Sequence, residues 1–296
     1  MFTMRKSTRT FGAALRAQRA LLGLTQREVA DRARVSVRAL RYIENGSAPR
    51  PDLLRRLAST VGLDSAVFTR TPSARIRILG PLEVEGVPVP LMQRRLLGLL
   101  ALHPNQVVTR EEIIDALWLD SPPHSHVHLV HNYVARLRSF SAVERAHGGY
   151  RLVADCGGLD LLRFNELLSR SDLAGLSEAV GLWRGPALAD LPAEVRLHPN
   201  AIALHQRRIA AVLAHTDMVL GAPGEPFSPS LITLAHDEPL HEGLQARLML
   251  ALARTGQQAS ALRLFERVRD RLAAELGVEP RRDLRDAHLR VLRQEV

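Results

Sequence analysis

The sequence predicts a mainly α-helical protein in three consecutive parts: a bundle of short helices, an α+β segment, and an all-helical remainder. Residues 9–68 show short helical patterns without a strand signal. Residues 75–90 alternate apolar and polar positions between turn residues, and residues 142–155 indicate a hairpin around a Gly-Gly pair. From Leu159 onward the pattern is helical and rich in Ala, Leu and Arg.

The composition is typical of a folded protein of two or three domains. The chain has 296 residues and one cysteine, Cys156, which cannot form an internal disulfide. No apolar run approaches the ~20 residues that a membrane span needs. The first residues lack the apolar stretch of a secretory signal. We therefore expect a cytoplasmic protein.

The net charge of +9 is concentrated at the amino-terminal end. Residues 1–70 contain 14 Arg and Lys against 5 Asp and Glu. Residues 71–157 contain 9 against 8, and residues 158–296 contain 17 against 18. A small, strongly basic domain is typical of polyanion binding. The alternative is a basic surface that only aids solubility.

Two short helices with a turn of about four residues between them predict a helix-turn-helix. Thr25 and Glu28 form a capping box at the start of the first helix, and Ser36 caps the second. The start of the second helix enters the major groove in this motif, where arginine can bond guanine O6 and N7. The residues expected on its outer face are Val37, Arg38, Arg41 and Tyr42.

The stretches GLTQREVA, VSVRALRYIENG and LLRRLASTVGL resemble the Cro/phage-repressor-like (XRE) helix-turn-helix family. The resemblance implies that Gln26 contacts a phosphate and braces the base-reading residues. It places Val37, Arg38 and Arg41 at base-reading positions. Arg34 stands where the family usually has glycine, so we expect mild backbone strain there and an added phosphate contact.

The second part predicts strands, three helices and a hairpin that would form a wing. Thr109 caps the middle helix, and the third helix has an apolar stripe of Val127, Val130, Val134 and Leu137. Its opposite flank is polar and basic, which suits contact with a DNA groove. The candidate DNA contacts of this helix and the wing are His128, His131, Asn132, Tyr133, Arg136, Arg138, Arg145 and Arg151.

The histidines of this helix have a competing interpretation. His124, His128 and His131 are spaced i, i+4 and i+7, so one helix face could present three imidazoles to a metal. No carboxylate or cysteine completes the set nearby. We therefore assign no metal site and no cofactor.

The stretches ILGPLEV, QRRLLGLLAL, VVTREEIIDALW, NYVARLR and GGYRL resemble the OmpR-type winged helix. The resemblance is closest to the version found in the Streptomyces antibiotic regulatory protein (SARP) family. It implies that Arg136 contacts a base. It also implies that His128, Asn132, Tyr133 and Arg138 contact the DNA backbone.

Residues 243–276 predict two helices around Thr255 and Gly256, with the length of a tetratricopeptide repeat. Such helix pairs stack into a concave binding surface. This region and the stretch LWRGPALADLP resemble the bacterial transcriptional activation domain of the same family. We expect three domains: a helix-turn-helix over 1–70, a winged helix over 75–156, and a TPR-like activation domain over 159–296.

The resemblance implies an activator of a specialised-metabolite (antibiotic) gene cluster. It would bind repeats in double-stranded promoter DNA and contact the sigma and alpha subunits of RNA polymerase. The sequence leaves open whether the protein forms a homodimer, and no membrane partner is expected. The chain lacks GxxxxGK[ST], G-x-S-x-G and H-E-x-x-H motifs, so we assign no catalytic residue and expect no enzyme. The alternative is a regulator whose helical repeats sense a peptide or small ligand.

Overall fold

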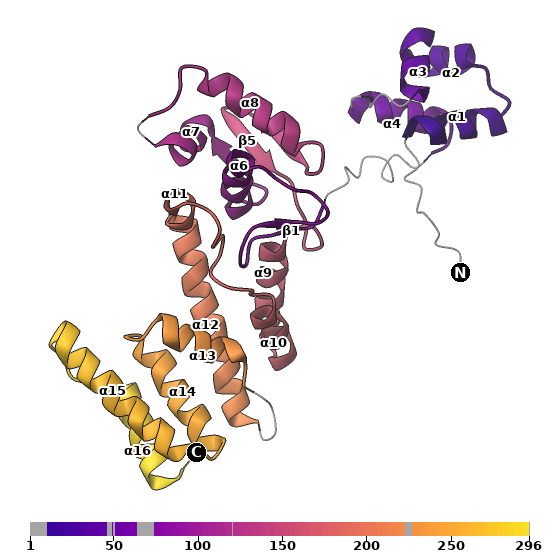
Figure 1. Ribbon diagram of the computed structural model, residues 1–296. Coiled ribbons are helices and arrows are strands. Elements are labelled where there is room, and N and C mark those ends of the chain that lie inside the picture. The colour runs from indigo at the N-terminus through magenta and orange to yellow at the C-terminus, as the bar shows by residue number, and fades with distance from the viewer. Residues whose placement is uncertain are drawn as a thin grey trace, which may run out of the picture. The chain divides into compact units, whose positions relative to one another are not determined.

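The computed structural model shows two compact units, residues 1–73 and 74–296, and each is described by itself (Figure 1). The described residues are 11–45, 49, 51–63, 74–119, 121–222 and 227–295. Residues 71–74, between the first two expected domains, lie outside them except for Ala74. Among the described helices, none has the length and apolar character needed to cross a membrane.

The first unit is a bundle of short helices with its own core. The helices are α1 (Phe11–Leu21), α2 (Gln26–Ala33), α3 (Val37–Glu44) and α4 (Pro51–Thr60). Thr25 Oγ1 accepts a hydrogen bond from Glu28 N at 3.2 Å, and the Glu28 carboxylate accepts from Thr25 N at 2.7 Å. Ser36 Oγ accepts from Ala39 N at 3.1 Å. Both predicted caps of the helix-turn-helix are therefore present.

The second unit begins with two small antiparallel sheets around three helices. The elements are β1 (Ile76–Arg77), β2 (Glu83–Val84), α6 (Leu91–Leu102), β3 (Val107–Thr109), α7 (Arg110–Trp118), α8 (His126–Leu137), β4 (Val143–Ala146) and β5 (Gly149–Leu152). β1 pairs with β2, and the other sheet has the order β3-β5-β4. The predicted hairpin is β4–β5, whereas β3 was not predicted. A Cβ on Gly149 would lie 1.9 Å from Val108 O, so glycine is required at this position, where β5 pairs with β3.

The remainder of this unit is helical, as the sequence predicts. The helices are α9 (Asp160–Arg170), α10 (Leu173–Gly181), α11 (Ala193–Arg196), α12 (Pro199–Gly221), α13 (Pro229–Asp237), α14 (Glu242–Arg254), α15 (Gln258–Leu276) and α16 (Arg282–Arg293). The predicted repeat over 243–276 is the pair α14 and α15. They pack with α16 around a core that includes Met249, Phe265 and Leu284.

The boundary between the expected domains 75–156 and 159–296 does not separate two cores. One continuous cluster of buried apolar side chains runs from Ile76 in β1 to residues of α12, α13 and α14. Ile76 N donates to Gly158 O at 2.8 Å. The Asp160 carboxylate, at the start of α9, accepts from Ile78 N at 2.9 Å and from Leu79 N at 3.1 Å. The winged helix and the helical domain therefore form one body.

The segment LWRGPALADLP binds the backbone carbonyls of the same two residues, Ile78 and Leu79. Arg184 N donates to Leu79 O at 2.8 Å, and Leu188 N donates to Ile78 O at 3.1 Å. A Cβ on Gly98 of α6 would lie 2.6 Å from the Leu191 side chain, so this segment lies directly against α6. A fragment ending at residue 158 would leave buried backbone groups unpaired and apolar side chains uncovered, which is costly.

Asp160→Asn tests this connection. The asparagine amide would direct an N–H group at a backbone N–H donor, so we expect the free energy of unfolding to fall by about 2–3 kcal/mol. Both tryptophans, Trp118 and Trp183, lie in this unit, so tryptophan fluorescence of the full chain in urea reports its unfolding.

Asp217→Asn is the matched control. Its carboxylate is half exposed and pairs with Arg247 at 2.9 Å on the surface. Removing such a pair costs about 1 kcal/mol or less. Equal effects of the two substitutions would show that Asp160 does not join the two parts.

Candidate nucleic-acid interface

A buried carboxylate organises the helix-turn-helix from within. The Glu44 side chain, at the end of α3, is fully buried and accepts hydrogen bonds from Arg19 Nε at 2.7 Å and Gln26 Nε2 at 2.7 Å. Arg19 also donates to Leu24 O at 2.9 Å. Glu44 therefore ties α1, α2 and α3 together.

Charge complementarity keeps this carboxylate ionised. Burial by itself raises the pKa of Glu44, but hydrogen bonds from Arg19 and Gln26, with the charges of Arg19 and Arg16, outweigh it and lower the pKa. Gln26 Oε1 in turn accepts from Arg41 Nε at 3.4 Å. Gln26 therefore contacts one of the predicted base-reading residues, whereas its bracing role and its phosphate contact stay predictions.

The outer face of α3 carries most of the predicted base-reading residues. Arg38, Arg41 and Tyr42 are exposed, with Tyr42 at 72%. Val37 differs from the prediction because it is half-buried and packs against the core of the first unit.

The turn between α2 and α3 has the backbone conformation expected at a position where the family usually has glycine. Arg34 has φ 54° and ψ 52°, in the left-handed region that favours glycine. Its N–H donates to Asp31 O at 3.2 Å and so closes the end of α2. The Arg34 side chain is exposed.

The exposed flank of α8 matches the sequence prediction at four positions. His128, His131, Asn132 and Arg136 are exposed, while Val130, Val134 and Leu137 are buried. The predicted apolar stripe is wrong at Val127, which is 40% exposed. Val127 lies in the first turn of α8, beyond the part of the helix that packs on the core.

Three of the four remaining candidate residues make contacts within the winged helix. Tyr133 stacks on Trp118 with ring centroids 6.4 Å apart, and Arg138 Nε donates to Val143 O at 2.7 Å. Arg151 pairs with Glu144 across the hairpin at 2.8 Å. Arg145 is exposed on β4. The wing is therefore fixed to the recognition helix through Arg138.

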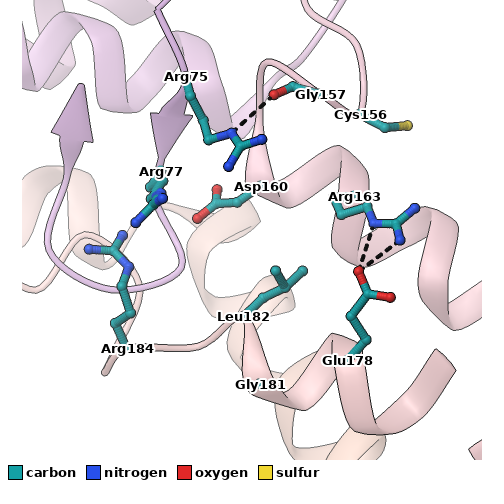
Figure 2. Close-up of a pocket in the computed structure, with 10 residues that line it drawn as sticks. All are labelled: Arg75, Arg77, Cys156, Gly157, Asp160, Arg163, Glu178, Gly181, Leu182 and Arg184. Atoms are coloured by element: carbon teal, nitrogen blue, oxygen red, sulfur yellow. Dashed lines mark hydrogen bonds and ion pairs between the residues drawn. The ribbon is translucent and has the colours of Figure 1, made fainter. Parts of the chain in front are cut away.

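An arginine-lined pocket of about 550 Å³ lies between β1 and helices α9 and α10. Figure 2 shows the residues that line it. The arginine pocket contains four guanidinium groups and two carboxylates. These belong to Arg75, Arg77, Arg163, Arg184, Asp160 and Glu178. Burial raises the pKa of the Asp160 carboxyl despite the backbone N–H donors beside it. The excess of positive charge suits an anionic group.

Sequence reasoning missed one cluster of metal-ligating side chains. Among the described residues, His103, Glu112 and His198 form the one group of three or more His, Cys, Asp or Glu whose ligand atoms converge. The histidine trio of α8 is not part of it. His198 is about 90 residues from the others in sequence, so no local spacing could have indicated the group.

The fold, a helix-turn-helix unit followed by a winged helix and a helical part, is that of a DNA-binding transcriptional regulator. Three family descriptions match it: "Helix-turn-helix" over residues 15–68, "Transcriptional regulatory protein, C terminal" over 85–144, and "Bacterial transcriptional activator domain" over 160–292. DnrI of Streptomyces peucetius is 30% identical over 251 residues, which cover 74% of this chain and 92% of DnrI. The chain belongs to the SARP family.

Other relatives agree on the same region. MoaR1 of Mycobacterium tuberculosis is 32% identical over 76% of this chain and 81% of its own length. AfsR of Streptomyces coelicolor is 36% identical over 68% of this chain, but the chain spans only 22% of AfsR. A structure of Mycobacterium tuberculosis EmbR in complex with a low-affinity phosphopeptide matches with a TM-score of 0.59 and 29% identity, over 75% of this chain and 65% of EmbR.

Glu44→Gln tests the carboxylate of the helix-turn-helix. Removing the charge leaves the buried side of Arg19 without its partner, so we expect a fragment of residues 1–73 to lose about 2–3 kcal/mol of unfolding free energy at neutral pH. Urea unfolding followed by circular dichroism measures the loss. Asp31→Asn, at an exposed position of α2, should change it by about 0.5 kcal/mol or less.

The stability that Glu44→Gln removes should depend on pH and should be smaller in acid. The pKa of Glu44 is lowered in the folded state, so its stabilisation is complete above the ordinary value of 4.5 and is lost as the pH falls through the lowered value. The stability difference between wild type and Glu44→Gln should therefore shrink in acid. A difference that stays constant from neutral pH into acid would contradict the ionised pairing.

Proposed function

We propose that this chain activates transcription of a specialised-metabolite gene cluster by binding repeats in promoter DNA and contacting RNA polymerase. The observation that carries the proposal is the pair of exposed, arginine-bearing recognition helices, α3 and α8, each on a separate compact unit. Arg38, Arg41 and Arg136 are the proposed base contacts, because arginine bonds guanine bidentately in the major groove.

Phosphate contacts would surround these residues on both units. Gln26, Arg34 and Tyr42 lie on or beside α3, while His128, Asn132 and Arg136 share the exposed flank of α8. Val37 offers an apolar edge for a thymine methyl group at the start of α3. The other proposed winged-helix contacts are His131, Tyr133, Arg138, Arg145 and Arg151.

The helical part, residues 159–296, is the proposed polymerase-contacting domain. The segment from 158 onward has 17 basic against 18 acidic residues, which gives no general attraction to phosphate. From the family we also propose contact with the sigma and alpha subunits of RNA polymerase and pairing of two copies on repeated sites. We further propose that the protein acts in the cytoplasm and has no enzymatic activity. Membership in the Streptomyces antibiotic regulatory protein family supports regulation of specialised metabolism.

Substitutions in the three arginines test the proposal on DNA that the chain itself selects from a random library. Arg38→Ala, Arg41→Ala and Arg136→Ala should each cost about 1–3 kcal/mol at the selected site and relax preference at particular base pairs. The changes from Arg38 and Arg41 should fall on a different part of the site from those of Arg136. Gel-shift titrations on single-base variants measure both.

Arg196→Ala, at an exposed position of α11, is the matched control and should leave DNA affinity unchanged. Uniform loss on every sequence would identify the three arginines as phosphate contacts instead. Transcription with purified RNA polymerase, at concentrations that give equal occupancy of the site, tests activation. Occupancy without stimulation by the wild-type chain would overturn the activator assignment.

A ligand-responsive regulator is the second candidate function, and the arginine pocket favours it. Three of its guanidinium groups already pair with carboxylates: Arg163 with Glu178 at 2.7 Å, and Arg184 and Arg77 with Glu83 at 2.8 Å and 3.7 Å. Arg75 bonds the carbonyl of Gly157 at 3.4 Å, as Figure 2 shows. A phosphate-bearing small molecule would suit this pocket.

Isothermal titration of the full chain with nucleoside triphosphates and with pyrophosphate tests the ligand hypothesis. Binding should weaken at least about tenfold in Arg75→Ala, since loss of a charge-assisted hydrogen bond costs about 1.5–3 kcal/mol. Arg196→Ala should bind like wild type. Absence of binding by the wild-type chain, or equal binding by both variants, would remove the support that the pocket gives to this function.

A further inference from the structure

Two histidines and one glutamate meet where the winged helix joins the helical domain. His103 follows the last residue of α6, Glu112 lies in the first turn of α7, and His198 caps α12. His103 Nε2 lies 3.4 Å from Glu112 Oε1, and His198 Nε2 lies 3.3 Å from the same oxygen. One ligand atom of each residue lies within 4.8 Å of the other two.

These separations fit a tetrahedral metal ion. Zinc binds histidine nitrogen at about 2.0–2.1 Å and carboxylate oxygen at about 2.0–2.2 Å, so adjacent ligands of a tetrahedral site lie about 3.3–3.5 Å apart. The two nitrogen–oxygen distances fall in this range. The histidine side chains are mostly buried, with 13% and 17% exposed, and that of Glu112 is 35% exposed.

The hydrogen bonding of His103 prepares its ring for a cation. Its Nδ1 lies 3.0 Å from Leu99 O, and because a carbonyl only accepts, Nδ1 carries the proton. In the neutral ring, Nε2 then presents a lone pair to a carboxylate oxygen, and two acceptors face each other. A cation between them removes this conflict. Metal-ligating histidines commonly donate their other nitrogen to a backbone carbonyl in this way.

His198 can supply the second nitrogen. Its Nε2 lies 3.3 Å from Glu112 Oε1, on the side that faces the other two residues of the group. Its Nδ1 accepts from Asn200 N at 3.2 Å. Zinc on Nε2 would shift the ring proton to Nδ1 and replace this capping bond with a metal–nitrogen bond.

We propose that His103, Glu112 and His198 bind one Zn²⁺, with water as the fourth ligand. Two histidines and one carboxylate are a donor set that zinc takes in proteins, whereas Mg²⁺ and Ca²⁺ prefer oxygen ligands throughout. The ion would link α6 and α7 of the winged helix to α12 of the helical domain. It would add a connection next to the hydrogen bond from Asn200 Nδ2 to Leu102 O at 3.3 Å.

Metal analysis of the purified full chain after equilibrium dialysis against Zn²⁺ tests the proposal, with thermal unfolding as a second readout. Wild type should retain one tight zinc per chain and unfold at a higher temperature with zinc than after chelation. Glu112→Gln and His198→Asn should weaken zinc binding at least about tenfold, judged from the effect of lesser changes around metal sites. Asparagine keeps the cap of α12, so His198→Asn removes the imidazole alone.

Two further variants act as controls. His205 pairs with Glu238 at 3.0 Å outside the proposed zinc group, and His128 belongs to the trio on α8. His205→Asn and His128→Asn should retain zinc like wild type. The proposal is overturned if wild type retains no tight zinc, if Glu112→Gln and His198→Asn retain it, or if His128→Asn loses it. Circular dichroism of each metal-free variant verifies its fold, and Co²⁺ absorption reports the ligand change independently of stability.

Discussion

The bond between the Asp160 carboxylate and the backbone of Ile78 and Leu79 is the contact on which the second unit depends. A sheet of two short strands, such as β1–β2, has little stability by itself. Beyond β1, both N–H groups are held by Asp160, and both carbonyls accept from Arg184 N and Leu188 N. Because all these partners belong to the helical part, the winged helix completes its backbone hydrogen bonding only when that part is folded against it.

One consequence concerns how promoter binding reaches the helical domain. α8 lies against α6, and α6 packs against α11 and the segment that contains Leu188 and Leu191. Within the part of the chain that the structure describes, one continuous core joins the winged helix to the helical part from Ile76 onward. Docking of α8 in a groove would therefore set the position of the helical domain on the promoter without a separate conformational step.

Local signals in the sequence predicted most elements, and long-range contacts account for the failures. Thr25, Ser36 and Thr109 were found as caps because a cap is decided by residues three positions apart. β3 was missed because it has three residues, runs directly into α7 and exists only through pairing with β5. From the sequence alone, Asp160 is only an acidic residue at the start of a helix, and Glu44 is only one charged residue on a short helix. Their roles depend on backbone and arginines far away in the chain, which one sequence does not place.

The two DNA-binding parts differ in whether each contains the contacts that it needs to fold alone. The helix-turn-helix has its own apolar core and its own buried ion pair between Glu44 and Arg19, so it carries what it needs to fold. That same carboxylate holds Gln26, and Gln26 accepts from Arg41, so stability and the position of a proposed base contact share one network. The winged helix lacks this independence because its inner face is closed by residues after 158. A domain of the first kind can be gained or lost by a chain without disturbing the rest, whereas the second kind must be kept together with its helical partner.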